Sequence, residues 1–196
     1  MKLPIFKARA SSAGVLMVSP RSKTETLSET TKSYLIEWLT EQVFGYRKEI
    51  NTKYTERGIL YEDKAIDFII NKLDLSFGVK NEINYEDDFF TGTPDLIIDG
   101  VVYDTKCSYS CHTFPFFEND LPNKNYYHQM QVYMHLTNTK KSCIAYVLFD
   151  NEEIGHVYNI EDEKRVKLFY VDYDSSIIEE LKNRILNCRE YINSLI

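Results

Sequence analysis

The feature that most constrains the fold of this chain is the pair Asp99-Gly100, which lies between two pairs of β-branched residues. Asp-Gly favours a two-residue hairpin turn, because both central positions of a type I′ turn need a positive φ. We therefore expect a β-hairpin with strands at 94–99 and 101–107. Its register would pair Ile98 with Val101, Ile97 with Val102 and Leu96 with Tyr103.

Continuing this register places two carboxylates, Asp95 and Asp104, directly opposite each other on one face of the hairpin. Side chains paired in this way have Cβ atoms about 4.5–5.5 Å apart. Lys106 follows Asp104 by two residues, so strand alternation points it to the same face. Opposed like charges destabilise a sheet unless a cation lies between them. The pattern therefore predicts a divalent metal site with a lysine beside it.

The length and composition predict a single soluble domain. The chain has 196 residues, of which 43% are hydrophobic and 14% aromatic, which suits a globular protein with a core. We find no run of 18 apolar residues and no signal-peptide pattern, so we expect a cytoplasmic protein, in the host cytoplasm if the chain is viral. Cys107 and Cys111 could be a metal or iron–sulfur ligand pair, but free thiols in a reducing compartment agree better with the cysteine spacing.

The charge distribution separates the N-terminal segment from the rest of the chain. A net charge of −7 argues against a protein that coats nucleic acid generally. Residues 1–23 nevertheless contain five basic residues and no acidic one. This segment could bind phosphate locally, or it could be a solvated arm.

Hydrophobic periodicity predicts an α/β fold, with a mixed central β-sheet flanked by helices. Helices are expected near 28–45, 55–73 and 124–137, and a last amphipathic helix carries Ile177, Leu181, Ile185, Cys188 and Ile192. Strands are expected at 79–90, in the hairpin, at 142–149, and once or twice between 154 and 172. An aromatic-rich loop covers 108–122.

An acidic residue interrupts the apolar stripe of the second helix. The stripe consists of Ile59, Glu62, Ile66, Ile69 and Leu73. A buried, unpaired carboxylate is costly, so Glu62 either lies at the edge of the stripe and reaches water or joins the two aspartates around a metal.

These residues together resemble the PD-(D/E)xK nuclease superfamily, in which Pro94-Asp95, Asp104-Thr105-Lys106 and Glu62 would supply the motif. Other segments resemble one branch, the lambda-exonuclease or YqaJ-type viral recombination nucleases. They are Arg57-Gly58 with Tyr61-Glu62, Gln129 to Tyr133, Ala10-Ser11-Ser12, and Pro20-Arg21-Ser22. The resemblance implies a restriction-endonuclease-like core, a single nuclease domain over 1–196, a basic segment at 1–25 and catalytic elements within 55–137.

The resemblance also implies a metal-centred active site. Glu62, Asp95, Asp104 and the carbonyl of Thr105 would bind Mg²⁺ or Mn²⁺, since hard oxygen ligands suit these ions. Lys106 would orient or deprotonate a water, or would stabilise charge in the transition state.

Residues around this site are expected to contact DNA. Gln129 or Gln131 would hold Lys106, a water or a phosphate, unless their helix simply packs on the sheet with Tyr133. The candidates for contacts to a DNA 5′ phosphate and its neighbours are Arg9, Ser11, Arg21, Thr93, Gln131 and Tyr133. The alternative for the N-terminal members is a flexible basic tail with a helix cap.

The aromatic loop is open to two interpretations. Phe114, Phe116 and Phe117 could stack on DNA bases, or they could cover the core or a subunit interface, which we consider the better interpretation.

The function implied by the resemblance is a metal-dependent deoxyribonuclease that degrades one strand of duplex DNA from an end. It would act 5′→3′, release 5′-mononucleotides in DNA recombination, form a homotrimer around the duplex and work with a single-strand annealing protein. One alternative is an endonuclease of the same superfamily. The other is a catalytically silent DNA-binding module on a nuclease fold.

Overall fold

The Asp99-Gly100 hairpin forms with the expected register in the computed structural model, which describes residues 3–46, 52–76, 78–152 and 155–196. Both turn residues have positive φ, at 50° for Asp99 and 76° for Gly100. The paired residues are Leu96 with Tyr103, Ile97 with Val102, and Ile98 with Val101. The turn therefore sets the position of every side chain on the two strands.

This hairpin is one side of a four-stranded mixed sheet, as predicted. Its strands are β4 (Leu96–Ile98), β5 (Val101–Ser108), β6 (Lys141–Leu148) and β7 (Val166–Asp172), in that order. Strands β5 and β6 are parallel and the other two pairs are antiparallel. A parallel pair needs a crossover connection, and helix α4 (Lys124–Thr137) lies in it, over the predicted residues.

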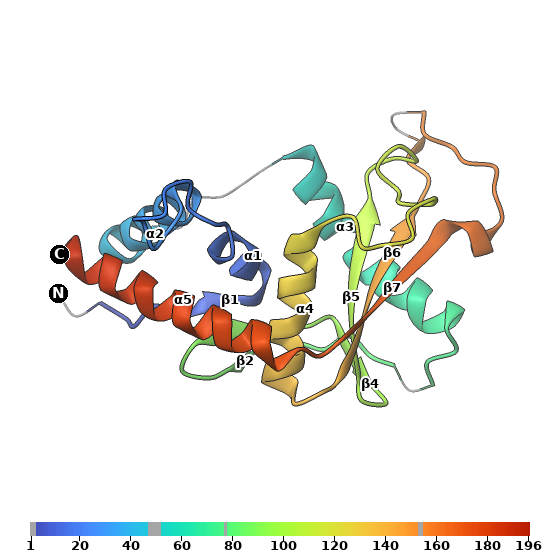
Figure 1. Cartoon of the computed structure of the whole chain (residues 1–196). Coiled ribbons are helices and arrows are strands. Elements are labelled where there is room, and N and C mark those ends of the chain that lie inside the picture. The colour runs from blue at the N-terminus through green and yellow to red at the C-terminus, as the bar shows by residue number, and fades with distance from the viewer. Residues whose placement is uncertain (1–2, 47–51, 77, 153–154) are drawn as a thin grey trace.

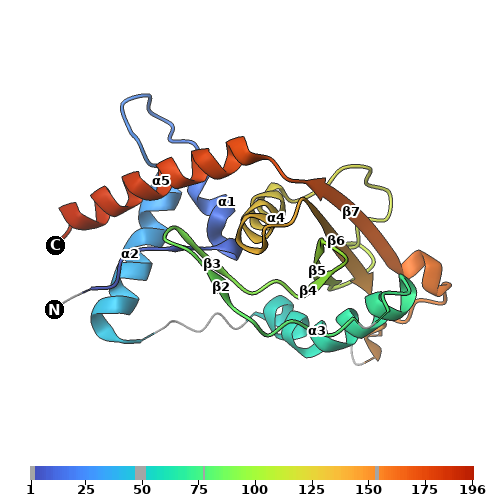
Figure 2. The same ribbon diagram turned by 90° about the horizontal axis from the view of Figure 1, so that it is seen from below.

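Two helices cover the two faces of this sheet (Figures 1 and 2). Helix α3 (Lys53–Lys72) lies on one face and α4 on the other. Ile66 and Ile69 of α3 are buried, as their stripe predicts, whereas Ile59 is 76% exposed. The inward face of α3 therefore begins later than the periodicity predicts.

A second, small sheet replaces the single strand that was expected over 79–90. Its order is β1 (Ala8–Arg9), β3 (Phe90–Gly92) and β2 (Tyr85–Glu86), with β1 parallel to β3. The prediction was wrong because Asp87 turns the chain: its Oδ1 accepts hydrogen bonds from the backbone N–H groups of Phe89 and Phe90, both at 2.7 Å.

The N-terminal segment is built into a helical layer and is not a solvated arm. After β1 it forms the 3₁₀ turn η1 (Ala10–Ser12) and helix α1 (Ala13–Leu16), whose alanines and Leu16 are buried. Helices α2 (Glu29–Phe44) and α5 (Ser175–Ser194) pack around them (Figure 1). Buried alanines and Leu16 hold residues 8–16 in the core, whereas residues 21–26 are exposed.

Helix α2 has the expected ends, each with a cap. Ser28 caps it by accepting a hydrogen bond from the Thr31 backbone N–H at 3.1 Å, and Gly45 ends it with a φ of 64°. Leu35 is buried whereas Ile36 and Val43 are exposed, so only part of the apolar surface of this helix faces the core. Among the described residues, no helix combines the length and apolarity needed to cross a membrane.

Candidate active site

The hairpin brings Asp95 and Asp104 together at the open end of β4. Residues 95 and 104 continue the ladder by one step beyond the last pair, Leu96 with Tyr103. The Asp95 Oδ2 accepts two hydrogen bonds from Thr105, from the backbone N–H at 2.6 Å and from Oγ1 at 2.8 Å. Because the N–H and C=O of one strand residue point to the same side, the Thr105 carbonyl also faces Asp95.

Asp104 is the most deeply buried acid of the site, with 2% of its surface exposed. Its Oδ1 accepts a hydrogen bond from the Gln129 Nε2 at 3.0 Å. Its Oδ2 forms an ion pair with Lys106. The Lys106 Nζ also lies 4.7 Å from the centre of the Tyr126 ring. The Asp104 carboxylate is thus paired with one cation, the Lys106 ammonium, in the metal-free protein.

Burial and the neighbouring acid make Asp95 an unusual carboxyl group. Burial first and Asp104 second raise the pKa of Asp95 from 3.8 to about 7, although the Thr105 hydrogen bonds and Lys106 act in the opposite direction. For Lys106, burial lowers the pKa, but Asp104 and Asp95 outweigh it and the pKa is raised. Lys106 is therefore a protonated cation in the metal-free protein.

The structure does not bring Glu62 into the carboxylate pair. Its side chain is 42% exposed at the rim of the site and its Oε1 lies 2.6 Å from the Nζ of Lys80. Lys80 also bonds Asp63 at 2.7 Å, and these two acids raise its pKa. Glu62 thus occupies the edge of the helix stripe and reaches solvent. In the described ranges, no three His, Cys, Asp or Glu residues are grouped closely enough to hold a metal.

The donor set nevertheless fits a hard divalent cation. Asp95 and Asp104 offer carboxylate oxygens, and the Thr105 carbonyl lies on the side of β5 to which its N–H points, toward Asp95. Such oxygen ligands suit Mg²⁺ or Mn²⁺ better than softer ions. A cation between the two aspartates would also offset both causes of the raised pKa of Asp95, first its burial and second its repulsion with Asp104.

The two glutamines of α4 lie in different environments. Gln129 is buried beside the site and its Nε2 also donates to the hydroxyl of Tyr133 at 3.1 Å. Gln131 is 0% exposed: its Nε2 donates to the Asp172 carbonyl and its Oε1 accepts from the Asp174 N–H, both at 2.8 Å. Gln131 therefore anchors α4 to the end of β7, contrary to the prediction that it contacts DNA.

A small pocket next to the carboxylates collects most of the predicted phosphate contacts. This pocket, here called the hydroxyl pocket, has a volume of about 190 Å³. It is lined by Arg9, Ala10, Ser11, Asn84, Thr91, Gly92, Thr93 and Tyr133. The predicted Arg21 is exposed and is not part of it.

Asn84 is a lining residue of the hydroxyl pocket that sequence reasoning missed. Its amide bonds the Thr91 hydroxyl at 3.1 Å, and its Oδ1 lies 3.3 Å from the Thr93 hydroxyl. A lone asparagine before a two-residue strand carries no sequence signal of such a role. Only the β2–β3 hairpin places it there.

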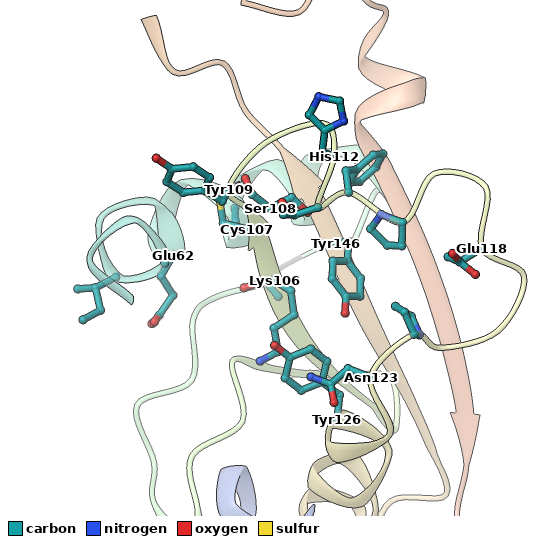
Figure 3. A pocket seen from close by; sticks show the side chains of 18 residues that line it. Glu62, Lys106, Cys107, Ser108, Tyr109, His112, Glu118, Asn123, Tyr126 and Tyr146 are labelled. Atoms are coloured by element: carbon teal, nitrogen blue, oxygen red, sulfur yellow. Dashed lines mark hydrogen bonds between the residues drawn. The ribbon is translucent and has the colours of Figure 1, made fainter. Parts of the chain in front are cut away.

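A larger cleft opens on the other side of Lys106 (Figure 3). It has a volume of about 800 Å³ and runs between α3 and the 108–123 loop. Lys106, Tyr126 and Tyr146 project into it, and Glu62 lies on its α3 side (Figure 3). Phe114 is buried at its wall, while Phe117 is 89% exposed. In this loop, Phe114 therefore covers the core and Phe117 faces solvent.

Arg57 is a further residue whose role the sequence did not reveal. It is buried, donates to the Phe149 carbonyl at 3.0 Å and lies over the Tyr61 ring at 4.4 Å. It therefore fixes the first turns of α3 to the end of β6, close to the cleft.

Comparisons with known proteins identify solved structures with a similar fold. Neither family models nor curated proteins gave a match. Among solved structures, the chain is similar to a phage-related exonuclease from Haemophilus somnus 129PT, with a TM-score of 0.88 and 28% identity over 98% of this chain and 96% of that one.

Two structures of the alkaline exonuclease LHK-Exo from Laribacter hongkongensis are also similar. The first has a TM-score of 0.74 and 17% identity, covering 96% of this chain and 88% of that one. The second is its complex with dAMP, with a TM-score of 0.72 and 18% identity over the same shares of the two chains. At this identity the likeness concerns the fold.

The fold and the site define the class: a PD-(D/E)xK nuclease fold with a restriction-endonuclease-like α/β core. Within that class, the chain is similar to a phage-related exonuclease and an alkaline exonuclease, which agrees with the resemblance to exonucleases seen in the sequence.

Proposed function

We propose that the protein is a metal-dependent exodeoxyribonuclease that degrades one strand of duplex DNA from its 5′ end. The observation that carries the proposal is the pair Asp95 and Asp104 with Lys106. Hydrogen bonds through Gln129 connect Asp104 to Tyr133, which lines a pocket of hydroxyl groups and an arginine. The similarity to two exonucleases supports the same activity class.

The carboxylates would hold Mg²⁺ or Mn²⁺. Asp95, Asp104 and the Thr105 carbonyl are the proposed ligands, and Glu62 would join them by exchanging Lys80 for the cation. When bound, the ion would supply positive charge against the scissile phosphate and would lower the pKa of a water.

Lys106 and Gln129 would act as polar groups around the reacting phosphate. Because its acidic neighbours keep Lys106 protonated, we favour charge stabilisation by its ammonium group over proton abstraction. Gln129 would hold Asp104 in position through its 3.0 Å hydrogen bond.

The hydroxyl pocket would bind the terminal 5′ phosphate. Arg9, Ser11 and Thr93 supply the types of donor that bind phosphate in proteins. Its volume of about 190 Å³ suits a phosphate group better than a nucleobase with its sugar. With the 5′ phosphate there and the next phosphodiester at Lys106, each cut would release one 5′-mononucleotide. The binding of dAMP by LHK-Exo is compatible with such a product.

A digestion time course tests the activity and its polarity. The substrates are linear duplexes labelled at the 5′ or the 3′ end, beside a covalently closed circle, all with Mg²⁺. We expect early release of the 5′ label from linear DNA only. We expect no activity for Lys106→Ala and full activity for the control Lys141→Ala, an exposed lysine at the start of β6. Cleavage of the circle would instead identify an endonuclease, and two intact substrates a silent binding module.

The remaining proposals rest on the resemblance alone. They are a homotrimer around the duplex, a single-strand annealing protein as partner, and a role in DNA recombination. Sedimentation of the purified protein tests the first, because a monomer at micromolar concentration would contradict it. Co-purification with a separately expressed annealing protein tests the second.

A further inference from the structure

One hydrogen-bonded chain links the catalytic carboxylate to the hydroxyl pocket. The Gln129 Nε2 donates to the Asp104 Oδ1 at 3.0 Å and to the Tyr133 hydroxyl at 3.1 Å. An amide nitrogen carries two hydrogens, so one group can serve both acceptors. All three side chains are buried, which means that water does not replace these bonds.

Among the residues that the structure describes, the hydroxyl proton of Tyr133 has no acceptor. The oxygen accepts from Gln129, and in the described part of the protein no further hydrogen bond is made by this hydroxyl. Burial, followed by Asp104, raises the pKa of Tyr133, so the phenol keeps its proton. Tyr133 lines the hydroxyl pocket together with Ser11 and Thr93, where an anion would accept that proton.

The ring of Tyr133 is also fixed against the backbone. A Cβ atom placed on Gly92 would lie 2.7 Å from the Tyr133 Cε1 and 2.9 Å from the Ala10 Cβ. This spacing is closer than real Cβ contacts, so glycine at 92 is what allows the ring to lie against β3. The ring is therefore held at one position against β3, where it lines the hydroxyl pocket while its hydroxyl is bonded to Gln129.

We propose that Tyr133 is a positioning residue that transmits the presence of a 5′ phosphate to the catalytic site. This proposal rests on the proposed function above. A phosphate in the hydroxyl pocket would accept a hydrogen bond from the Tyr133 hydroxyl. The phenol oxygen would then remain directed at the amide of Gln129. Hydrogen bonds in a chain polarise and strengthen one another, so the amide is then held on Asp104. A 5′-hydroxyl end lacks this acceptor, so the series of hydrogen bonds would end at Tyr133.

The consequence is a difference in turnover, not only in binding. At saturating DNA, wild type should cut a 5′-phosphorylated duplex about tenfold faster than the matched 5′-hydroxyl duplex, the factor that corresponds to about one hydrogen bond to a charged group. Tyr133→Phe should lower the rate on phosphorylated ends and bring the ratio of the two kcat values close to one. Ser11→Ala removes a phosphate contact but leaves the hydrogen bonds among Tyr133, Gln129 and Asp104 intact. It should therefore raise KM and keep most of the ratio between kcat on the phosphorylated and the hydroxyl duplex.

The experiment measures kcat and KM on both duplexes for wild type, Tyr133→Phe, Ser11→Ala and a control, Tyr34→Phe. Tyr34 is a suitable control because its hydroxyl is buried in the α2 layer and, within the described residues, has no hydrogen bond. The control should keep the wild-type kcat ratio. Gly92→Ala, which displaces the same ring, should also lower that ratio and serves if Tyr133→Phe does not fold.

Two results would overturn the inference alone. In one, wild type cuts both kinds of end with the same kcat. In the other, Tyr133→Phe slows both ends by the same factor, which is the behaviour of a merely structural side chain. A folded wild type that cuts neither duplex would overturn the proposed function, and the inference with it.

Discussion

At the scale of single residues, the hairpin register sets the carboxylates of Asp95 and Asp104 opposite each other. Opposed acids are unfavourable in a sheet, and the protein manages them with Thr105, Gln129 and Lys106. Burial first and the remaining repulsion from Asp104 second raise the pKa of Asp95 to about 7. A group poised in this way releases its proton readily when a divalent cation arrives.

This pKa predicts how the stability of the metal-free protein depends on pH. The folded pKa of Asp95 lies above its unfolded value of 3.8, so the folded state binds more protons between pH 4 and pH 7. The contribution of this group to the free energy of unfolding therefore falls as pH rises through that range, by at most about 4 kcal/mol. Asp95→Asn removes this penalty, so its melting temperature should exceed that of wild type by a margin that grows from pH 4 to pH 8.

Thermal unfolding in the presence of a chelator measures this margin. Adding Mg²⁺ should raise the melting temperature of wild type and not that of Asp95→Asn. A margin that stays constant with pH would show that Asp95 titrates normally.

At the scale of elements, the Asp99-Gly100 turn determines where the site residues lie. Gly100 has a φ of 76°, and a Cβ added to it would meet no atom within 4 Å. A substitution there acts through backbone conformation alone. Gly58 is the natural comparison, because it lies inside α3 with equally open surroundings and no positive φ.

Opposite effects on stability are therefore expected for the same change at these two glycines. Gly100→Ala should lower the free energy of unfolding by about 1–2 kcal/mol, since the left-handed conformation is unfavourable for alanine. Gly58→Ala should raise it by roughly 0.5–1 kcal/mol, since glycine weakens a helix interior. Urea unfolding measures both. Equal changes for the two variants would contradict a type I′ turn at 99–100.

At the scale of the whole molecule, local patterns were predictable and long-range contacts were not. The hairpin register and the bounds of α4 follow from turn chemistry and periodicity, and both are confirmed. The pairing of Glu62 with Lys80 and the use of Gln131 as an anchor to β7 depend on segments that meet only in the folded chain. The small sheet depends on β1 and β3, which lie about eighty residues apart in sequence.

The same limit applies to the candidate site. Ser11, Thr93 and Arg9 were predicted as phosphate contacts, and the fold gathers them in one pocket, although contact with phosphate itself is still a prediction. Arg21 matched the same pattern but lies outside that pocket. Sequence patterns identify the residue types that a site needs, and the packing of β1, η1 and β3 determines which of those residues line the pocket.

The most direct test of the account compares two aspartates of the one hairpin. Nucleotide release from a linear duplex with Mg²⁺ is measured for wild type, Asp104→Asn and Asp99→Asn, at equal folded fractions. Asp99→Asn should retain wild-type activity, because residue 99 lies in the exposed turn, where asparagine also tolerates positive φ. Asp104→Asn should lose at least about a thousandfold, as expected when a residue that binds a catalytic metal is removed. Similar activities for the two variants would contradict the assignment of this carboxylate pair as the active site.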